Sequence, residues 1–113
     1  MTWYEDLYVG ESIIHKTSKI IWKIRHNAGV LNIYVIALAS NENNLLDIIP
    51  AHELLQKGYP KQQLYIVGLA KGYDEAVEVA AAIIAEVYQK TGTFAVRKYL
   101  IKKSREDECQ SYC

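Results

Sequence analysis

Two short polar segments follow two apolar runs and carry side chains suited to bind a small anion. The first segment is Ser40 to Asn43, and the second is Lys71 to Asp74. If the two runs are neighbouring parallel strands, both segments lie at the carboxyl edge of the sheet, where α/β proteins gather their ligands. Amides at a helix start and a lysine could hold a carboxylate or phosphate there. The candidate ligand-binding residues are Ser40, Asn41, Lys71, Gly72 and Tyr73.

An ordinary capped turn is the competing interpretation of both segments. Asn43 and Asp74 can themselves accept hydrogen bonds from the free amides of the helices that follow them. Asp74 and Glu75 would also repel an anion. The stretch from Gly68 to Gly72 lacks the Gly-Lys-Ser/Thr ending of a phosphate-binding loop. Capped turns are therefore the interpretation that the sequence favours.

The histidines and cysteines do not follow the spacing of a metal site. His15 and His26 share one side of a predicted helix but lie about three turns apart, too far to bind one ion. Cys109 and Cys113 stand in a polar tail without two further ligands nearby. No nucleophile has the adjacent base or glycines that would activate it. We therefore expect a non-catalytic protein that holds neither a metal nor a cofactor.

Trp22 stands out because it lies off the apolar face of the helix predicted around it, among polar and basic side chains. One interpretation is ordinary packing, in which Trp3, Leu7 or Tyr8 covers it. The other is a protein–protein interface, since Trp, Tyr and Arg are typical anchors of such contacts. The candidate interface residues are Trp22, Arg25, His26, Tyr4 and Tyr8.

The same predicted helix has a basic side that could contact a nucleic-acid backbone. It carries Lys16, Lys19, Lys23 and Arg25 against the single anion Glu11. The whole chain, however, has 13 basic and 13 acidic residues and a formal net charge of zero. Strong nonspecific attraction to nucleic acid or to an anionic membrane is therefore not expected. Nucleic-acid contact remains a minority alternative to a solvated helix face.

An internal repeat suggests the elements that must position these residues. Residues 33–48 (IYVIALASNENNLLDI) align with residues 64–79 (LYIVGLAKGYDEAVEV). Each copy is an apolar run, a polar break with a capping residue and an amphipathic start, which predicts a strand followed by a helix. Two such units in one sheet run parallel, connected by a right-handed crossover.

Periodicity and turn residues place the other elements around this repeat. Isoleucines at helical spacing favour a helix over a strand near Ile20 to Arg25. Pro50 has no amide for a helical hydrogen bond, so a helix that follows the first apolar run must end or restart there. The expected elements are a helix Trp3–Tyr8, a helix Glu11–Ala28, a strand Val30–Ala39, helical pieces Asn44–Ile49 and Pro50–Lys57, a strand Gln63–Ala70, a helix Glu75–Lys90, and a strand Thr93–Ile101 with a helix over Arg97–Lys103 as its alternative.

We therefore predict an α/β fold with a small three-stranded, mostly parallel sheet, in β-α-β-α-β order from the doubled βα unit. An N-terminal helical segment packs on its open face. Residues 1–101 form a single domain, and residues 102–113 form a frayed polar tail. Three strands are few, so we expect a homodimer or contact with another protein. The absence of an apolar run of ~20 residues and of a signal-peptide pattern at the start favours a cytoplasmic protein.

Overall fold

The computed structural model describes residues 1–38, 45–56 and 64–101. The elements in chain order are β1 (Thr2–Val9), the 3-10 helix η1 (Glu11–Ile13), α1 (Thr17–Arg25), β2 (Ile33–Leu38), β3 (Leu46–Pro50), the 3-10 helix η2 (Ala51–Leu55), β4 (Tyr65–Lys71) and α2 (Tyr73–Thr91). Residues 96–101 are also helical.

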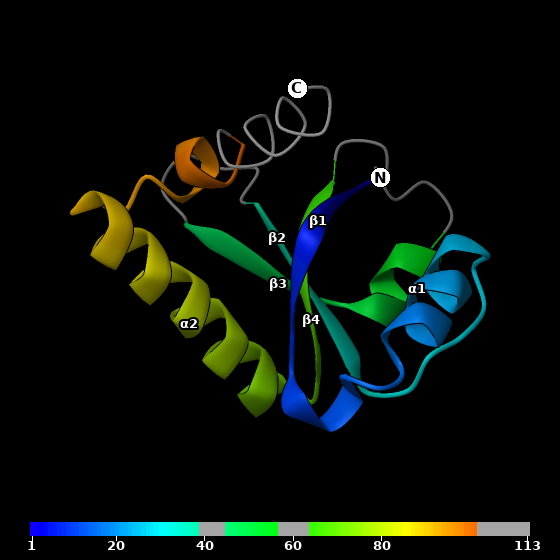
Figure 1. Cartoon of the computed structure of the whole chain (residues 1–113). Helices are drawn as coiled ribbons and strands as arrows, with labels where there is room; N and C mark the ends of the chain where they lie inside the picture. Colours follow the sequence, from blue (N-terminus) through cyan, green and yellow to red (C-terminus); the bar gives the residue numbers. More distant parts are fainter. Residues whose placement is uncertain (39–44, 57–63, 102–113) are drawn as a thin grey trace, which may run out of the picture.

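Within the described residues, the sheet has four strands in the order β1-β4-β2-β3 (Figure 1). Only β1 and β4 run parallel, because β2 is antiparallel to both β3 and β4. The prediction of a three-stranded, mostly parallel sheet is therefore wrong. The strands of the two repeat copies are neighbours, as expected, but they run in opposite directions.

The first repeat copy forms a hairpin instead of a strand followed by a helix. Of the helix expected from Asn44 to Ile49, residues 46–49 lie in β3, which pairs with β2 without a register shift. Pro50 has no amide to continue a helix, so the segment before it is short. Along β3, Ile48 packs on the α2 side of the sheet and Ile49 on the opposite side, which is the alternation of a strand.

The two ends of the domain also differ from the prediction. Residues Trp3 to Tyr8 lie in β1 and not in a helix, in keeping with the preference of aromatic side chains for strands. The strand expected over Thr93–Ile101 is absent, because residues 96–101 are helical. Val96 and Leu100, one helical turn apart, are both buried. The helical alternative for this region begins within a residue of the observed one.

The second repeat copy is a strand followed by a helix, as predicted. The long helix α2 begins at Tyr73, two residues before the expected start, and its N-cap is Gly72 without a side-chain cap. Asp74 is therefore inside the first turn and does not cap the helix. At the other end Gly92 takes a left-handed conformation, φ 72°, and closes the helix one residue beyond the expected end at Lys90.

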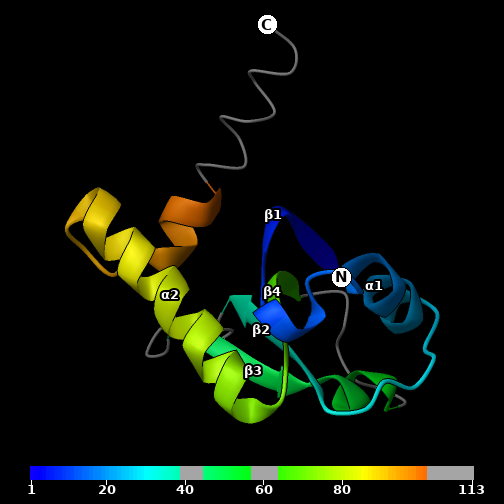
Figure 2. The same cartoon turned by 60° about the horizontal axis from the view of Figure 1, so that its bottom comes forward.

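Both faces of the sheet are covered, so the molecule has three layers (Figures 1 and 2). The helix α2 and residues 96–101 pack on one face, around Ile36 and Val67. The helix α1, shorter than the predicted Glu11–Ala28, packs with η1 and η2 on the other face, around Val35 and Ile66. Among the described residues, no helix is both long enough and apolar enough to cross a bilayer.

Candidate interaction surfaces

The predicted crevice between two loops does not form, because β2 and β4 are antiparallel. Lys71, the last residue of β4, pairs with Ile33, the first residue of β2. The carboxyl end of β2, at Leu38, therefore lies at the opposite end of the strand pair. The predicted ligand-binding residues Ser40 and Asn41 follow that end and lie outside the described residues.

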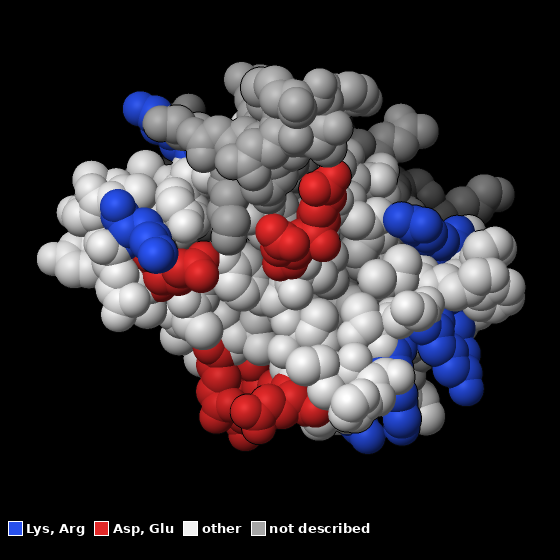
Figure 3. All heavy atoms as spheres, viewed as in Figure 1, with Lys and Arg blue, Asp and Glu red and all other residues white. Residues whose placement is uncertain are grey.

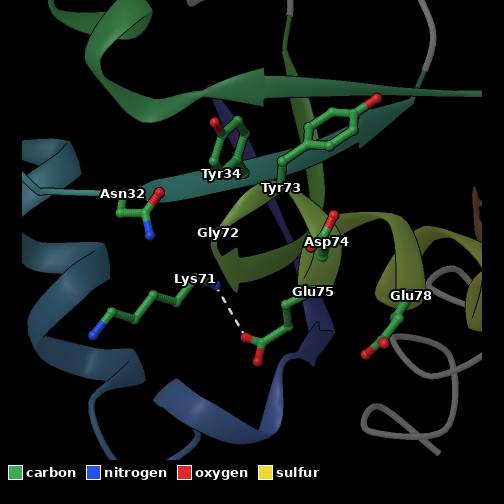
Figure 4. A pocket seen from close by; sticks show the side chains of 8 residues that line it. All are labelled: Asn32, Tyr34, Lys71, Gly72, Tyr73, Asp74, Glu75 and Glu78. Carbon is green, nitrogen blue, oxygen red and sulfur yellow. Dashed lines mark hydrogen bonds between the residues drawn. The ribbon is translucent and has the colours of Figure 1, made fainter.

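The other predicted ligand-binding residues, Lys71, Gly72 and Tyr73, line a wide, open depression at the start of α2 (Figure 4). Its volume is about 580 Å³. In Figure 4 the side chain of Lys71 extends away from Tyr73 and Asp74. The remaining lining residues include three carboxylates, Asp74, Glu75 and Glu78. An anion in this depression would therefore meet more negative than positive charge.

One of these carboxylates already has hydrogen-bond partners within the protein. Glu75 Oε1 accepts a hydrogen bond from the backbone amide of Lys71 at 3.0 Å and from the Ser12 hydroxyl at 2.8 Å. The bond from the Lys71 amide is the main reason that the pKa of Glu75 lies below its ordinary value. Glu75 thus ties the start of α2 to the end of β4 and to η1, which is a structural role.

The helix α1 presents an exposed aromatic pair to solvent. Trp22 is 57% exposed, and its ring stacks on that of His26 with centroids 4.2 Å apart. His26 Nδ1 also donates a hydrogen bond to the carbonyl oxygen of Trp22, at 2.8 Å, which fixes the imidazole against the helix. The interpretation that Trp3, Leu7 or Tyr8 covers Trp22 is therefore wrong, because more than half of the Trp22 side chain remains exposed.

Of the other predicted interface residues, Tyr4 and Tyr8 do not join this pair, and Arg25 does so only in part. The guanidinium of Arg25 lies over the ring of Trp3, 5.7 Å from its centroid, a cation–π contact inside the protein. Tyr4 is only 2% exposed and belongs to the core. The hydroxyl of Tyr8 donates a hydrogen bond to Glu86 on α2. The candidate interface is therefore reduced to Trp22, His26 and the outer side of Arg25.

The net charge of zero hides an uneven distribution over the surface. Figure 3 shows basic side chains gathered over α1 and acidic ones over β1 and the start of α2. In the sequence, no Asp or Glu occurs between Ser12 and Leu38, a stretch that holds the four cations of the α1 region. The α1 face is thus distinctly positive and carries an exposed tryptophan.

A larger apolar surface lies on α2, and it was not among the predicted sites. We call it the α2 stripe. It runs along one side of the helix, beside the buried side formed by Ala76, Ala80, Ile83 and Val87. Three of its members are strongly exposed, Tyr73 at 57%, Val77 at 42% and Tyr88 at 52%. The α2 stripe consists of Tyr73, Val77, Ala81, Ile84 and Tyr88.

The α2 stripe adjoins the edge strand β3. At one end, the ring of Tyr73 meets that of Tyr34 edge-on, with centroids 5.9 Å apart. Tyr34 pairs with the last residue of β3, and Leu46 and Ile48 of β3 are only partly buried on the same side of the sheet. Near the other end, Tyr88 stacks on exposed Phe94 at 5.0 Å.

The sequence contained the signal for the α2 stripe. Its members follow one another at spacings of three and four, the same spacing as the buried side of α2. Two adjacent apolar sides on one helix indicate that the helix packs against two surfaces, the sheet and a second one.

No protein-family model, curated protein or solved structure significantly matches this chain. Function must therefore be inferred from the surfaces of the molecule itself.

Proposed function

We propose that this protein works without catalysis, through contact with other proteins, and that its first partner is a second copy of itself. The observation that carries the proposal is the α2 stripe, with its exposed Tyr73, Val77 and Tyr88. Contiguous apolar surface of this kind marks interaction sites when polar residues surround it. Here Asp74 and Glu78 flank the stripe on its solvent side.

Aromatic residues increase what such a surface can contribute. Tyrosine combines a large apolar area with a polar tip and loses little conformational entropy, which makes it a common anchor of protein contacts. The stripe has a tyrosine at each end, and Phe94 extends it beyond Tyr88.

Among the described residues, no group of three or more potential ligands could hold a metal ion, so no site of that kind competes with this proposal.

The oligomeric state tests the proposal directly. Sedimentation equilibrium and light scattering of the full chain at micromolar concentrations should show a concentration-dependent dimer. Ala81→Lys places a charge in the middle of the α2 stripe and should shift the chain toward monomer. Burying an unpaired ammonium in an interface is costly, so we expect at least a tenfold weaker association, which corresponds to about 1.4 kcal/mol.

The chain offers a matched control next to this position. Ala82 is also exposed on α2 but points away from the stripe. Ala82→Lys makes the same chemical change with the same helix propensity, and both lysines lie within reach of Glu78 at helical spacing. It should leave the dimer unchanged. A strict monomer at all concentrations would contradict self-association, and equal effects of the two lysines would rule out the stripe.

A second candidate function is contact with a single-stranded nucleic acid through α1. The specific observation in its favour is the exposed Trp22–His26 stack within a region of four cations and no acidic residue. Exposed aromatic rings beside a basic track are what single-stranded nucleic acids bind, because bases stack on the ring while cations meet the phosphates. The zero net charge of the chain argues against strong binding.

A further inference from the structure

The two edges of the sheet differ in how well they could accept another strand. At the β1 edge the pairing register with β4 shifts between Trp3 and Tyr8, and Glu5 and Asp6 are exposed there. Bulges and charged residues are the usual means by which proteins block an edge strand from pairing. The β1 edge is therefore protected against a new strand.

Within the described residues, the β3 edge is less protected, with one charged residue and a final proline but no bulge. In the described part of the chain, β3 has a strand neighbour only on the β2 side, and it keeps a regular register over its five residues. Asp47 is its one charged residue, between apolar neighbours. A regular, mostly apolar edge of this kind is a template for pairing with another strand.

We infer that the dimer named under Proposed function forms by pairing β3 with the β3 of a second copy, antiparallel and about a two-fold axis perpendicular to the sheet. The inference rests on that proposed function and specifies its geometry. The four-stranded sheets of two copies then join into one continuous sheet. A symmetric pairing of this type is isologous and closes at two copies.

The register of this pairing follows from the alternation of side chains. A two-fold axis perpendicular to the sheet keeps each face on the same side, so residues that face each other must belong to the same face. The axis must then pass midway between one residue and the same residue of the second copy. Centring on Ile48 aligns all five residues and places Asp47 opposite the partner's Ile49. Centring on Asp47 would place like charges opposite each other, which is unfavourable.

The same axis arranges the two α2 helices favourably. It puts them on one face of the joined sheet, antiparallel, with the α2 stripes turned toward each other. Five paired residues alone would bury less than the ~1,200 Å² expected of a stable complex, so the stripes must supply further area. Their exposed tyrosines extend toward that seam.

Charge complementarity supports the antiparallel arrangement. Residues 73–82 carry three acidic side chains and no basic one. Residues 83–101 carry three basic side chains, Lys90, Arg97 and Lys98, against the single acid Glu86. Within α2 the second half is neutral, with Glu86 and Lys90, and the two other bases follow in the helix of residues 96–101. Antiparallel α2 helices therefore place the acidic first half of one copy opposite the neutral second half of the other. A parallel arrangement would bring like halves together, which makes the second copy a better fit in this orientation.

Symmetric cross-linking tests the inference. Ile48→Cys is introduced into the full chain together with Cys109→Ser and Cys113→Ser, which remove the other thiols. Residues directly opposite in an antiparallel pair are close enough for a disulfide. Mild oxidation should therefore give a covalent dimer as the main species. Glu5→Cys in the same background, on the β1 edge, should stay monomeric on a non-reducing gel.

Hydrogen exchange provides a second measurement that needs no substitution. The amides of residues 46–49 should exchange more slowly as concentration drives the wild-type chain from monomer to dimer. Dimers seen by sedimentation without the cross-link in the Ile48→Cys variant and without this protection would overturn the β3 pairing while leaving self-association intact. A covalent dimer from Glu5→Cys alone would also overturn it. A chain that stays monomeric throughout would remove the proposed self-association, and the β3 pairing with it.

Discussion

The hydroxyl of Tyr8 on the edge strand β1 donates a hydrogen bond to the carboxylate of Glu86 on α2, across 78 positions of sequence. The ring of Tyr8 is parallel to that of Tyr4, with centroids 6.2 Å apart, and Tyr4 is buried beneath α2. The irregular half of β1 is thus fastened to the helix layer by a side-chain contact. This bond compensates for the backbone pairing with β4 that the register shift interrupts.

We therefore expect Tyr8→Phe to destabilise the fold. The variant keeps the ring and its packing on Tyr4 but removes the donor to a charged acceptor. The free energy of unfolding should fall by about 1.5 kcal/mol, at the low end for a bond to a charged group because Tyr8 is only partly buried. Urea unfolding measures it. A double-mutant cycle with Glu86→Ala, which removes the acceptor, isolates the pair, and additive effects of the two changes would contradict a direct bond.

The same pair predicts a pH dependence of stability at alkaline pH. Burial, and then the neighbouring Glu86 carboxylate, raise the pKa of Tyr8 above its ordinary value. In the unfolded chain Tyr8 ionises at about pH 10, whereas in the folded protein it stays protonated to higher pH. Its contribution to stability is therefore complete below about pH 10 and is lost as the pH rises further.

Urea unfolding of wild type and Tyr8→Phe at several pH values tests this sign. The stability difference between the two proteins should be constant at neutral and mildly alkaline pH. It should shrink above about pH 10, because only the wild type loses the Tyr8 contribution there. A difference that grows in this range would contradict the assignment.

Gly68 should not tolerate a larger side chain. It lies in the middle of β4, and a Cβ atom there would stand 2.9 Å from the backbone oxygen of Tyr8 and 3.3 Å from Val79 Cγ1. The backbone oxygen cannot move aside without displacing β1. Gly68→Ala should therefore cost about 1–3 kcal/mol of unfolding free energy, as overpacked cores do.

Gly29→Ala is the matched control for this substitution. Nothing lies within 4 Å of a Cβ atom at Gly29, and its backbone is outside the left-handed region. This variant should be neutral or more stable by up to about 1 kcal/mol, because alanine restricts the unfolded chain. Thermal unfolding of the two variants side by side measures the contrast. Equal effects at both positions would show that β1 does not approach β4 so closely.

The second candidate function predicts salt-sensitive retention of single-stranded RNA or DNA. Trp22→Ala should weaken binding by about 1–3 kcal/mol, the contribution of one stacked base. Lys19→Gln should lower the dependence of log K on log salt by about 0.7, one phosphate contact on a single strand. Lys90→Gln, a similar change on α2, is the control and should have no effect. The absence of retention at low salt would refute this candidate.

The sequence predicted those elements whose pattern is long and whose ends carry clear signals. The helix after Gly72 spans 19 residues with a glycine at its end, and it was located within two residues. The helix around Ile20 was found from the spacing of its isoleucines, but α1 is shorter than expected. The period correctly placed Trp22 off the apolar face, but the interpretation that Trp3, Leu7 or Tyr8 covers it is wrong, because its side chain is 57% exposed.

The errors arose in short segments, where too few residues were available to distinguish a helix from a strand. Leu46 to Ile49 resembles the start of α2 in the repeat, and four residues are too few for periodicity to separate the two states. The helix expected over Trp3–Tyr8 was equally short, and these residues pair with β4 as a strand instead. Because β3 is a strand and not a helix, β2 and β4 are antiparallel instead of parallel. The carboxyl ends of β2 and β4 then lie at opposite ends of the strand pair, and the predicted anion crevice does not form.

The parallel pairing of β1 with β4 has a consequence for how the chain acquires its structure. Thr2 pairs with Tyr65, so β1 cannot join the sheet during synthesis until β4 has been made. Closing so long a segment costs chain entropy before any contact repays it, which slows folding. Until then the aromatic segment of β1 stays unpaired, and unpaired segments of this kind are prone to aggregate.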